Sequence, residues 1–321
     1  MAGVPKAVRT SSNAVLVFMD HLELAKDFAR QEKSAATRKA YRSDIAIFTS
    51  WCTAHDVDSL PASPETIAAF LSAEVLNGLK ASTLTRRVAA IAYAHQLAGH
   101  ESPTNSKEVK ITMRGIRRAI GTAKTQKSPA TAERLLSMLA HIPNSLQGKR
   151  DRALLLIGFA GAFRRSELVA LTMDDVEEVD QGLRIIVRRS KTDQESEGEI
   201  VPILRGKYAC PVEALNDWLA AAGITDGPLF RSIRKGGHVQ QRALSTKSVA
   251  MIVKTYAAKA GLNAEDFAGH SLRAGFLTSA ADKGANIFRM MDQSRHKSVD
   301  TLRGYIRRAG DFKDHPGDGL L

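Results

Sequence analysis

The stretch DQGLRIIVRR, residues 180–189, carries the one clear β-strand signal in the sequence. Its β-branched run from Leu183 to Arg189 follows a turn at residues 180–182, a combination typical of a strand in a hairpin. The polar residues 190–198 then lead to a second short strand, predicted at residues 199–204. Elsewhere helical patterns dominate. We therefore predict a mainly α fold with a small antiparallel sheet.

Residues 14–120 show helical patterning alone. Ser63 is followed by a proline and an acid, which together favour a helix start. The predicted helices cover residues 14–30, 34–54, 63–76, 82–99 and 106–120, and the inner face of the second is expected to hold Tyr41, Ile45, Ile47, Phe48 and Trp51. These segments predict a helical domain at residues 14–120, preceded by a flexible arm at residues 1–13.

A polar segment rich in helix breakers, residues 121–130, predicts a basic linker to a second domain at residues 131–321. That domain holds both predicted strands and is otherwise helical. Its predicted helices cover residues 133–141, 150–161, 166–171, 211–222, 245–260, 271–283, 287–293 and 299–306.

The charge of the chain indicates a polyanionic partner. The 321 residues suit two domains, and 46 Lys and Arg against 34 Asp and Glu give a net charge of +12. Such an excess most often marks nucleic-acid binding. Two cysteines exclude a disulfide framework and fit a reducing compartment. The absence of a signal peptide and of a long apolar run favours action in the cytoplasm, on DNA, with no membrane partner.

Several classes of enzyme chemistry are excluded by missing motifs. The sequence has no GxxxxGK[ST] loop for ATP, no HExxH or paired Cys/His spacing for a catalytic metal, and no GxSxG elbow of a serine hydrolase. We therefore expect neither a metal nor another cofactor. An enzyme acting on DNA would then have to work on phosphate with its own side chains.

Side chains suited to that task occur in the second domain. Singly, each has an ordinary explanation: Arg164 and Glu167 could form a surface salt bridge, and Tyr305 could be a core aromatic. Together they run along the chain in the order Arg164, Glu167, Lys191, His270, Arg273, His296 and Tyr305.

This order resembles the catalytic domain of the tyrosine recombinases, the phage integrase family. FRRSEL (residues 163–168) is similar to the first-arginine box, HSLR (270–273) to the H-x-x-R box, and HKSVDTLRGY (296–305) has the family's His-to-Tyr spacing. Lys191, after a strand, resembles the hairpin lysine. Two departures stand out: Arg295 replaces the usual glycine, and only sixteen residues follow Tyr305.

The resemblance implies DNA cleavage and rejoining through a covalent 3′-phosphotyrosine, without ATP. Tyr305 is then the nucleophile, and Arg164 and Arg273 clamp the phosphate. His270 takes or orients the tyrosine proton, and Lys191 protonates the leaving 5′-oxygen. His296 donates a hydrogen bond to the phosphate, and Glu167 holds the geometry.

Charge and resemblance together imply a two-domain, C-shaped clamp on double-stranded DNA and a homotetramer that joins two DNA sites. Lys247, in the first turn of its helix, is a candidate for base contact. Candidates for contact with DNA, chiefly its phosphates, are Arg38, Lys39, Arg86, Arg87, Arg114, Arg117, Arg118, Arg231, Arg234 and Lys235.

Two other functions use the same residues. A topoisomerase-like enzyme would nick and close one duplex by the same chemistry. A DNA-binding protein on the same scaffold would have lost catalysis, although every catalytic position holds a competent residue.

Overall fold

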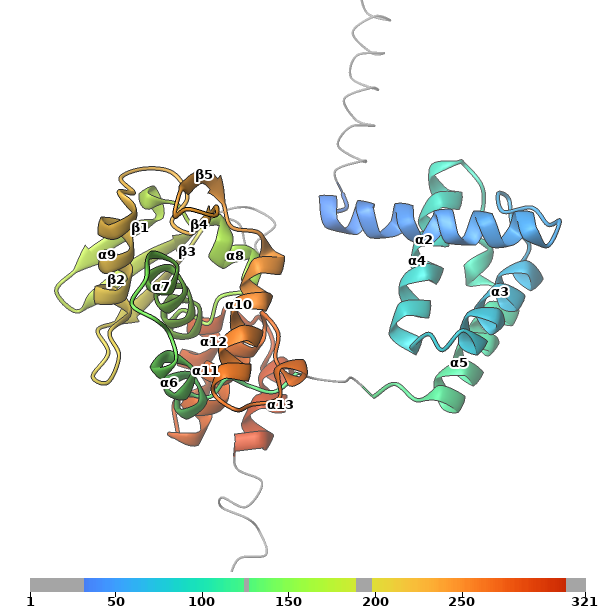
Figure 1. The fold of residues 1–321 in the computed structure, drawn as a ribbon. Helices are drawn as coiled ribbons and strands as arrows, with labels where there is room; N and C mark the ends of the chain where they lie inside the picture. Colours follow the sequence, from blue (N-terminus) through green and yellow to red (C-terminus); the bar gives the residue numbers. More distant parts are fainter. Residues whose placement is uncertain (1–31, 124–126, 189–197, 310–321) are drawn as a thin grey trace, which may run out of the picture. The chain divides into compact units, whose positions relative to one another are not determined.

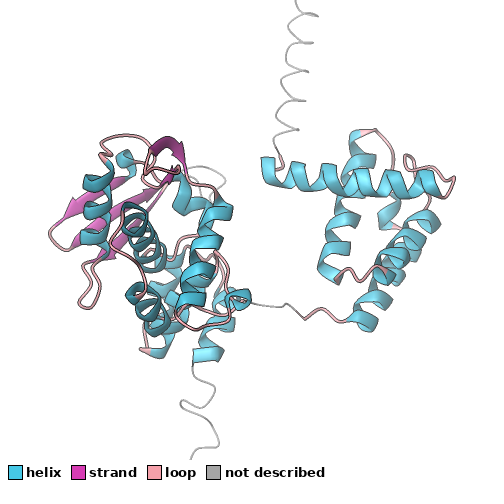
Figure 2. Ribbon diagram, viewed as in Figure 1, coloured by secondary structure: helices cyan, strands magenta, loops and turns pink. Residues whose placement is uncertain are grey.

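The computed structural model describes residues 32–123, 127–188 and 198–309, with only the backbone at 306–309. The chain divides into two compact units, Met1–Lys124 and Thr125–Leu321 (Figure 1). Helices dominate both units and strands occur in the second (Figure 2), so the prediction of a mainly α fold with a small antiparallel sheet is confirmed. The predicted helix 14–30 lies outside the described residues.

The first unit is a bundle of α2 (Ala35–Ala54), α3 (Pro64–Leu76), α4 (Ala81–Leu97) and α5 (Lys107–Ile120), with a 3₁₀ turn η1 (Pro103–Asn105) before α5. The hydroxyls of Ser34, Ser63 and Ser106 accept hydrogen bonds from backbone N–H groups in the first turns of α2, α3 and α5. These caps satisfy donors that a helix start leaves unpaired.

Aromatic and aliphatic side chains fill the core of this unit. The Phe48 and Phe70 rings meet edge to face, 5.0 Å between centroids. Both are buried, with Ile67, Leu71 and Leu84. The prediction for α2 was wrong at Ile47, which is 39% exposed because it lies beside the helix stripe that turns inward.

The second unit contains helices α6 to α13 around a small sheet. The helices, with their short 3₁₀ turns, are α6 (Ala132–Ala140), α7 (Leu146–Ala160), α8 (Arg165–Ala170), η2 (Met173–Asp175), α9 (Pro211–Ala222), α10 (Thr246–Lys259), η3 (Ala264–Asp266), α11 (Ser271–Asp282), α12 (Ile287–Ser294) and α13 (Val299–Ala309). The strands are β1 (Val176–Val179), β2 (Gly182–Val187), β3 (Glu199–Leu204), β4 (Arg231–Ile233) and β5 (Val239–Ala243).

The sheet is antiparallel, in the order β1-β2-β3, and β4 and β5 form a separate hairpin. Alternate residues of β2 point into the core: Leu183, Ile185 and Val187 are buried. On β3 the buried partners are Val201 and Ile203. Burial alternates in this way because one face of the sheet packs against the core and the other faces solvent.

Three of these strands were not predicted. β1 has the sequence VEEV, and β4 and β5 read RSI and VQQRA. Such short and largely polar runs lack a local strand signal. They are strands because partner strands supply their hydrogen bonds. The start of α7 was also predicted a turn too late, because Ser145 caps the helix by accepting from the Gly148 N–H.

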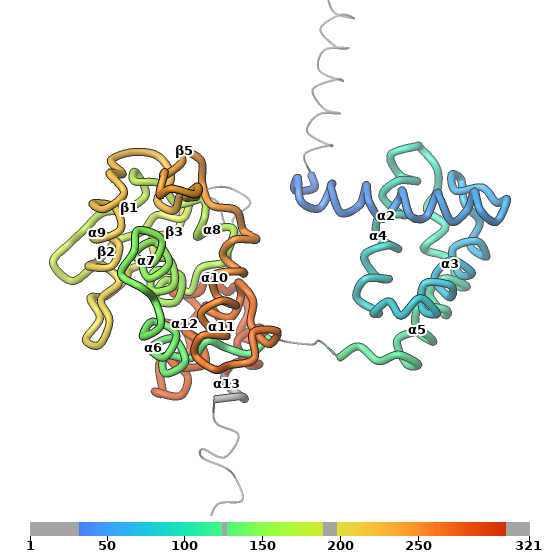
Figure 3. Tube along the Cα trace, viewed as in Figure 1, coloured from blue at the N-terminus to red at the C-terminus, as the bar shows by residue number. Residues whose placement is uncertain are grey.

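Helix α7 organises the second unit. Residues 153–158 of α7 are all buried, and the helix contacts α8, α9, α10, α11 and β3. Figure 3 follows the chain from α7 to α11, far apart in sequence and side by side in the fold. Helix α11 in turn packs against α12 and α13. The described segments that hold Arg164, Arg273 and His296 thereby lie near the C-terminal end of α7, where the Ala162 carbonyl accepts from Arg273.

Candidate active site

The turn between α7 and α8 places the first candidate arginine. Ala162 adopts a positive φ of 45°, and the Phe163 ring lies so close to Gly161 that a Cβ there would stand 2.1 Å from it. A side chain at position 161 would therefore clash with the Phe163 ring, so this position favours glycine. Arg164 follows as the N-cap of α8, and its backbone N–H donates to Glu167 Oε2 at 2.8 Å.

Glu167 is buried between two guanidinium groups. Its Oε1 accepts from Arg164 Nη1 at 2.6 Å and its Oε2 from Arg295 Nη2 at 2.8 Å. Burial alone would raise the pKa of Glu167, but the charges and hydrogen bonds of Arg295 and Arg164 outweigh it and lower that pKa. The carboxylate is therefore ionised and holds both guanidiniums.

The second candidate arginine is also in the interior. Arg273 lies in the first turn of α11, is 4% exposed, and donates from Nη1 to the Ala162 carbonyl at 2.7 Å. Burial, followed by repulsion from Arg164 and Arg295, lowers the pKa of Arg273 to about 9. The side chain is still a cation at neutral pH.

His296 is next to Arg273, at a distance of 3.2 Å from Nη2 to the ring Nε2. Ser294 Oγ donates to the Met290 carbonyl, so it accepts from the Nδ1–H of His296, 2.7 Å away. That assignment leaves Nε2 as the acceptor. Burial, then the nearby arginines, lowers the pKa of His296 to about 4, so the ring is neutral at neutral pH.

The half-buried Tyr305 completes the group from α13. Its ring centroid is 6.3 Å from that of His296, at an angle of 43°. The ring rests on a small apolar cluster of Leu277, Met290 and Leu302, taken from α11, α12 and α13. Those three helices thus hold the tyrosine beside the cationic site.

Two further residues predicted to be catalytic, His270 and Lys191, are not part of this buried group as the structure describes it. His270 is exposed at the N-cap of α11, one turn before Arg273. Lys191 lies outside the described residues. The structure therefore brings together Arg164, Glu167, Arg273, His296 and Tyr305 from three well-separated segments.

Sequence reasoning missed a residue of this cluster. It noted Arg295 only as a departure from a glycine, yet the side chain is buried against Glu167 and over the Phe163 ring, with Cζ 5.0 Å from the centroid. The departure from glycine was itself the signal. A helix often ends in a residue of left-handed backbone conformation, which glycine adopts easily and arginine does not, so an arginine there needs compensating contacts.

The candidate DNA-contacting residues divide by exposure. Lys247 lies on the first turn of α10 and is exposed. The other exposed members are Lys39, Arg86, Arg114, Arg117, Arg118, Arg234 and Lys235, whereas Arg38 is half-buried. Arg86 is held by Asp44, which accepts from its Nε at 2.7 Å and its Nη2 at 2.9 Å.

The structure contradicts a surface role for Arg87 and Arg231. Arg87 is 7% exposed, and its guanidinium lies between the carboxylates of Asp44 and Glu74. Arg231 is 4% exposed and donates to Asp226 and Gln241. Neither guanidinium faces a surface that a DNA backbone could approach, because Arg87 is paired with two buried carboxylates and Arg231 is buried among the groups that accept its hydrogen bonds.

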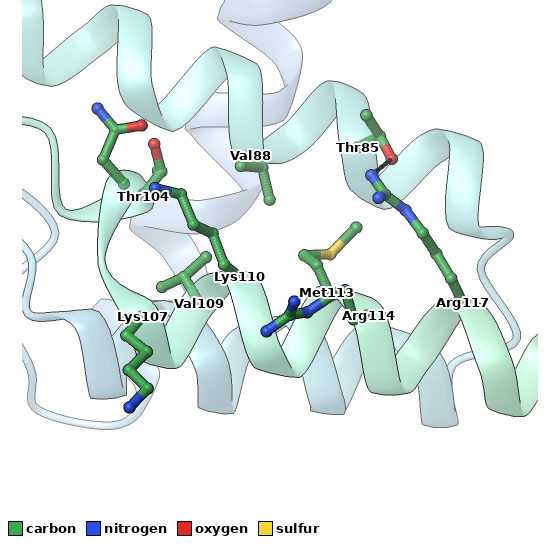
Figure 4. A pocket seen from close by; sticks show the side chains of 10 residues that line it. Thr85, Val88, Thr104, Lys107, Val109, Lys110, Met113, Arg114 and Arg117 are labelled. Atoms are coloured by element: carbon green, nitrogen blue, oxygen red, sulfur yellow. Dashed lines mark hydrogen bonds between the residues drawn. The ribbon is translucent and has the colours of Figure 1, made fainter.

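A basic groove of about 550 Å³ lies in the first unit between α4, η1 and α5 (Figure 4). Val88, Val109 and Met113 contribute apolar side chains to it. Its cations are Arg114 and Arg117, together with Lys107 and Lys110, which the sequence reasoning had not singled out as contacts. Arg117 Nη2 donates to Thr85 Oγ1 at 3.3 Å.

Membrane-spanning helices and metal sites are both absent from the residues that the structure describes. None of their helices is long and apolar enough to cross a membrane. Nor do residues 32–123, 127–188 and 198–309 contain a group of His, Cys, Asp and Glu that could hold a metal ion.

Comparison with known proteins identifies the family of the chain. A profile of the phage integrase family matches residues 129–310, and a profile of the phage integrase N-terminal SAM-like domain matches residues 18–102. The integrase/recombinase XerD homolog of Selenomonas ruminantium is 44% identical over 295 residues, which cover 89% of this chain and 86% of that protein. Recombinase Cre of Escherichia phage P1 is 26% identical over 297 residues, with coverages of 87% and 85%.

Solved structures share the fold. A crystal structure of a lambda integrase dimer bound to a COC′ core site aligns with a TM-score of 0.63 at 20% identity and covers 93% of this chain and 97% of that one. A post-cleavage complex of the XerH site-specific recombinase with palindromic difH substrate aligns with a TM-score of 0.59 at 19% identity, with coverages of 78% and 70%.

Proposed function

The chain belongs to the phage integrase family of tyrosine recombinases and is a site-specific DNA recombinase; we propose that Tyr305 is its nucleophile. One observation carries this assignment: Tyr305, His296 and Arg273 form a continuous group although they come from α13, the α12–α13 turn and α11. A tyrosine beside buried cations suits attack on a phosphodiester, because negative charge that builds on the phosphate is stabilised there.

In the proposed reaction, Tyr305 Oη attacks the scissile phosphorus while the bond to the 5′-oxygen breaks. The products are a 3′-phosphotyrosine and a free 5′-hydroxyl, and rejoining reverses the step. Because a phosphodiester bond is exchanged for another, no ATP is consumed. His270 accepts the tyrosine proton, and Lys191 gives the leaving oxygen its proton.

The phosphate is bound by Arg164 and Arg273. Guanidiniums suit this role because they stay charged and can bind two oxygens at once. Glu167 fixes Arg164 through two hydrogen bonds, one to its side chain and one to its backbone N–H. His296 contributes a ring nitrogen beside Arg273, and it donates to the phosphate once that nitrogen is protonated.

DNA binding involves both units in this proposal. Residues 14–120 would bind one part of the duplex, residues 131–321 would contain the catalytic site, and the basic linker 121–130 would join them. The exposed cations of α5 and Lys247 on α10 are the proposed contacts, since they face solvent and most carry no acidic partner that the structure describes. The protein would act in the cytoplasm on nucleoid DNA, as a homotetramer on two sites.

The test is capture of the covalent intermediate. Wild type, Tyr305→Phe and Tyr208→Phe are incubated with DNA flanking the gene, nicked at successive positions, then denatured and resolved on a gel. Tyr208 is the matched control, because it lies in the same unit and is 82% exposed. We expect an adduct on Tyr305 in the wild type and in Tyr208→Phe, and none in Tyr305→Phe.

The same experiment separates the alternatives. Adducts that resolve as strand exchange between two duplexes are recombination, whereas relaxation of a single supercoiled circle is nicking and closing. Tight binding without any adduct, on DNA that contains the true site, would mean a binding protein that has lost catalysis.

A further inference from the structure

Arg295 occupies a backbone conformation that disfavours arginine. It is the C-cap of α12 with φ 56° and ψ 45°, in the left-handed region. A glycine fits this region without steric cost, whereas a residue with a Cβ does not. The side chain is also 1% exposed, so a charge is kept out of water. Both features oppose stability, and contacts must compensate them.

Three of the four hydrogen bonds of the Arg295 guanidinium lead to the neighbourhood of Arg164, and the fourth runs from Nη1 to the Gln293 carbonyl at 3.0 Å. Its Nη2 donates to Glu167 Oε2 at 2.8 Å and to the Ala162 carbonyl at 3.2 Å. Its Nη1 donates to the Gly161 carbonyl at 3.2 Å. Arg295 therefore binds the backbone of the strained turn and the carboxylate that follows it.

These contacts link both proposed phosphate-binding arginines. The other oxygen of Glu167 holds Arg164 Nη1, and the Ala162 carbonyl also accepts from Arg273 Nη1. The buried Arg295 side chain thus shares the Glu167 carboxylate with Arg164 and the Ala162 carbonyl with Arg273. Nε of Arg295 also lies 4.0 Å from a carboxylate oxygen of Glu199, the first residue of β3.

We propose that Arg295 is a positioning residue of the active site: it fixes Glu167 and the Ala162 carbonyl so that Arg164 and Arg273 face the same phosphate. It does not touch the phosphate, because its guanidinium is fully enclosed by the protein. The proposal rests on the function assigned above.

The charge of Arg295 also acts on His296. The groups that face this ring are Arg273 from α11, Arg164 and Glu167 from the α8 segment, Tyr305 from α13, and Arg295 itself. Burial and the three arginines lower the pKa of His296, and Glu167 opposes them. Removal of the Arg295 charge should therefore raise the pKa of His296.

The experiment uses the full chain with two readouts. NMR titration of the His296 ring without DNA, assigned by its loss in His296→Gln, reports the electrostatic effect. The rate of adduct formation on nicked DNA, with the Kd for that DNA, reports the catalytic effect. The variants are Arg295→Met, which keeps volume without charge, and Arg295→Lys, which keeps charge. Lys297→Met is the control, because it removes an exposed charge one residue from His296.

For Arg295→Met we expect adduct formation to slow by on the order of 10–100-fold, as when a group that orients a reactive residue is lost. The Kd should be unchanged and the His296 pKa should rise. Arg295→Lys should keep the low pKa and regain part of the rate, and Lys297→Met should change neither. Arg295→Gly, which relieves the backbone, replaces Arg295→Met if the latter does not fold.

The proposal is overturned if the folded Arg295→Met or Arg295→Gly variant forms adduct at the wild-type rate. It is also overturned if adduct formation slows while His296 titrates as in the wild type, because Arg295 would then only support the fold. If the wild type itself forms no adduct, the proposed function has failed, and the titration still tests the placement of Arg295.

Discussion

Substitution of Glu167 by glutamine tests the electrostatics of the buried cluster. The carboxylate is 2% exposed and accepts from the Arg164 N–H, from Arg164 Nη1 and from Arg295 Nη2. Glutamine keeps the shape but removes the charge, which leaves the buried guanidinium of Arg295 with only the more exposed Glu199 carboxylate, 4.0 Å from its Nε. Removal of one partner of a buried ion pair costs about 3–5 kcal/mol. Because total stability is about 5–15 kcal/mol, the loss is a large fraction of it.

The expected change in melting temperature follows from the size of the unit. In a unit of roughly 200 residues, each kcal/mol shifts the Tm by about 2–4 °C. Glu167→Gln should therefore lower the Tm of the second unit by about 6–20 °C at neutral pH, as measured by calorimetry. Glu177→Gln is the matched control: Glu177 pairs with Arg184 on the surface, where an ion pair contributes little.

The stability difference between the wild type and Glu167→Gln should depend on pH, and the pKa of Glu167 gives the direction. The arginines lower the pKa of Glu167 below its usual 4.5 despite burial. A carboxyl whose pKa is lower in the folded state stabilises the fold above its usual pKa, and that contribution is lost as the pH falls through the folded value. The gap between wild type and Glu167→Gln should thus be widest at neutral pH and should close below pH 4.5. A gap that stays constant down to pH 3, or a variant that melts like the wild type, would refute the reasoning.

Two further predictions concern packing and DNA binding. A Cβ on Gly275 of α11 would lie 1.8 Å from the Ala130 carbonyl oxygen, so Gly275→Ala should lower the free energy of unfolding in urea by about 1–3 kcal/mol. The control is Gly115→Ala in α5, where a Cβ would have no neighbour within 4 Å, and it should be neutral or stabilising. Equal effects of the two substitutions would contradict the packing. Lys247→Met should weaken binding of duplex DNA and lower the slope of log K against log salt by about one, measured by anisotropy titration, and an unchanged slope would remove Lys247 from the interface.

The exposure of α4 shows what the sequence could have revealed. Leu84, Arg87 and Ile91 lie at the spacing of one helix face, and all three are buried. Strict use of this period would have assigned Arg87 to the core and left Arg86 outside. The partners of Arg87 could not have been predicted in the same way, because Asp44 and Glu74 come from α2 and α3 and only tertiary packing brings them close.

The candidate site likewise combines features that the sequence predicts with contacts that only tertiary packing decides. The residue types and their order along the chain singled out Arg164, Arg273, His296 and Tyr305, which the structure brings together. The partner of Arg295 could not be predicted, because Glu167 lies more than a hundred residues earlier and the two meet only through the packing of α11 on α7 and of α12 on α11. Local patterns give the face of a helix, whereas a buried ion pair between distant segments depends on the whole fold.

The charge balance of the buried arginines around Glu167 suggests a use for an arrangement that costs stability. Arg164, Arg273 and Arg295 surround the buried carboxylate of Glu167, and His296 is neutral, so these groups carry a net charge of +2, which the more exposed Glu199 near Arg295 offsets only in part. A phosphodiester brings one negative charge and gains a second as the tyrosine oxygen adds to it. In the proposed reaction the cluster therefore complements the transition state better than the bound substrate, and such differential binding accelerates a reaction. In this proposal a bound phosphate offsets the repulsion that, after burial, lowers the pKa of Arg273 and His296 in the free protein. The arginines are already held by Glu167 and the Ala162 carbonyl, so they need no rearrangement at the moment of reaction.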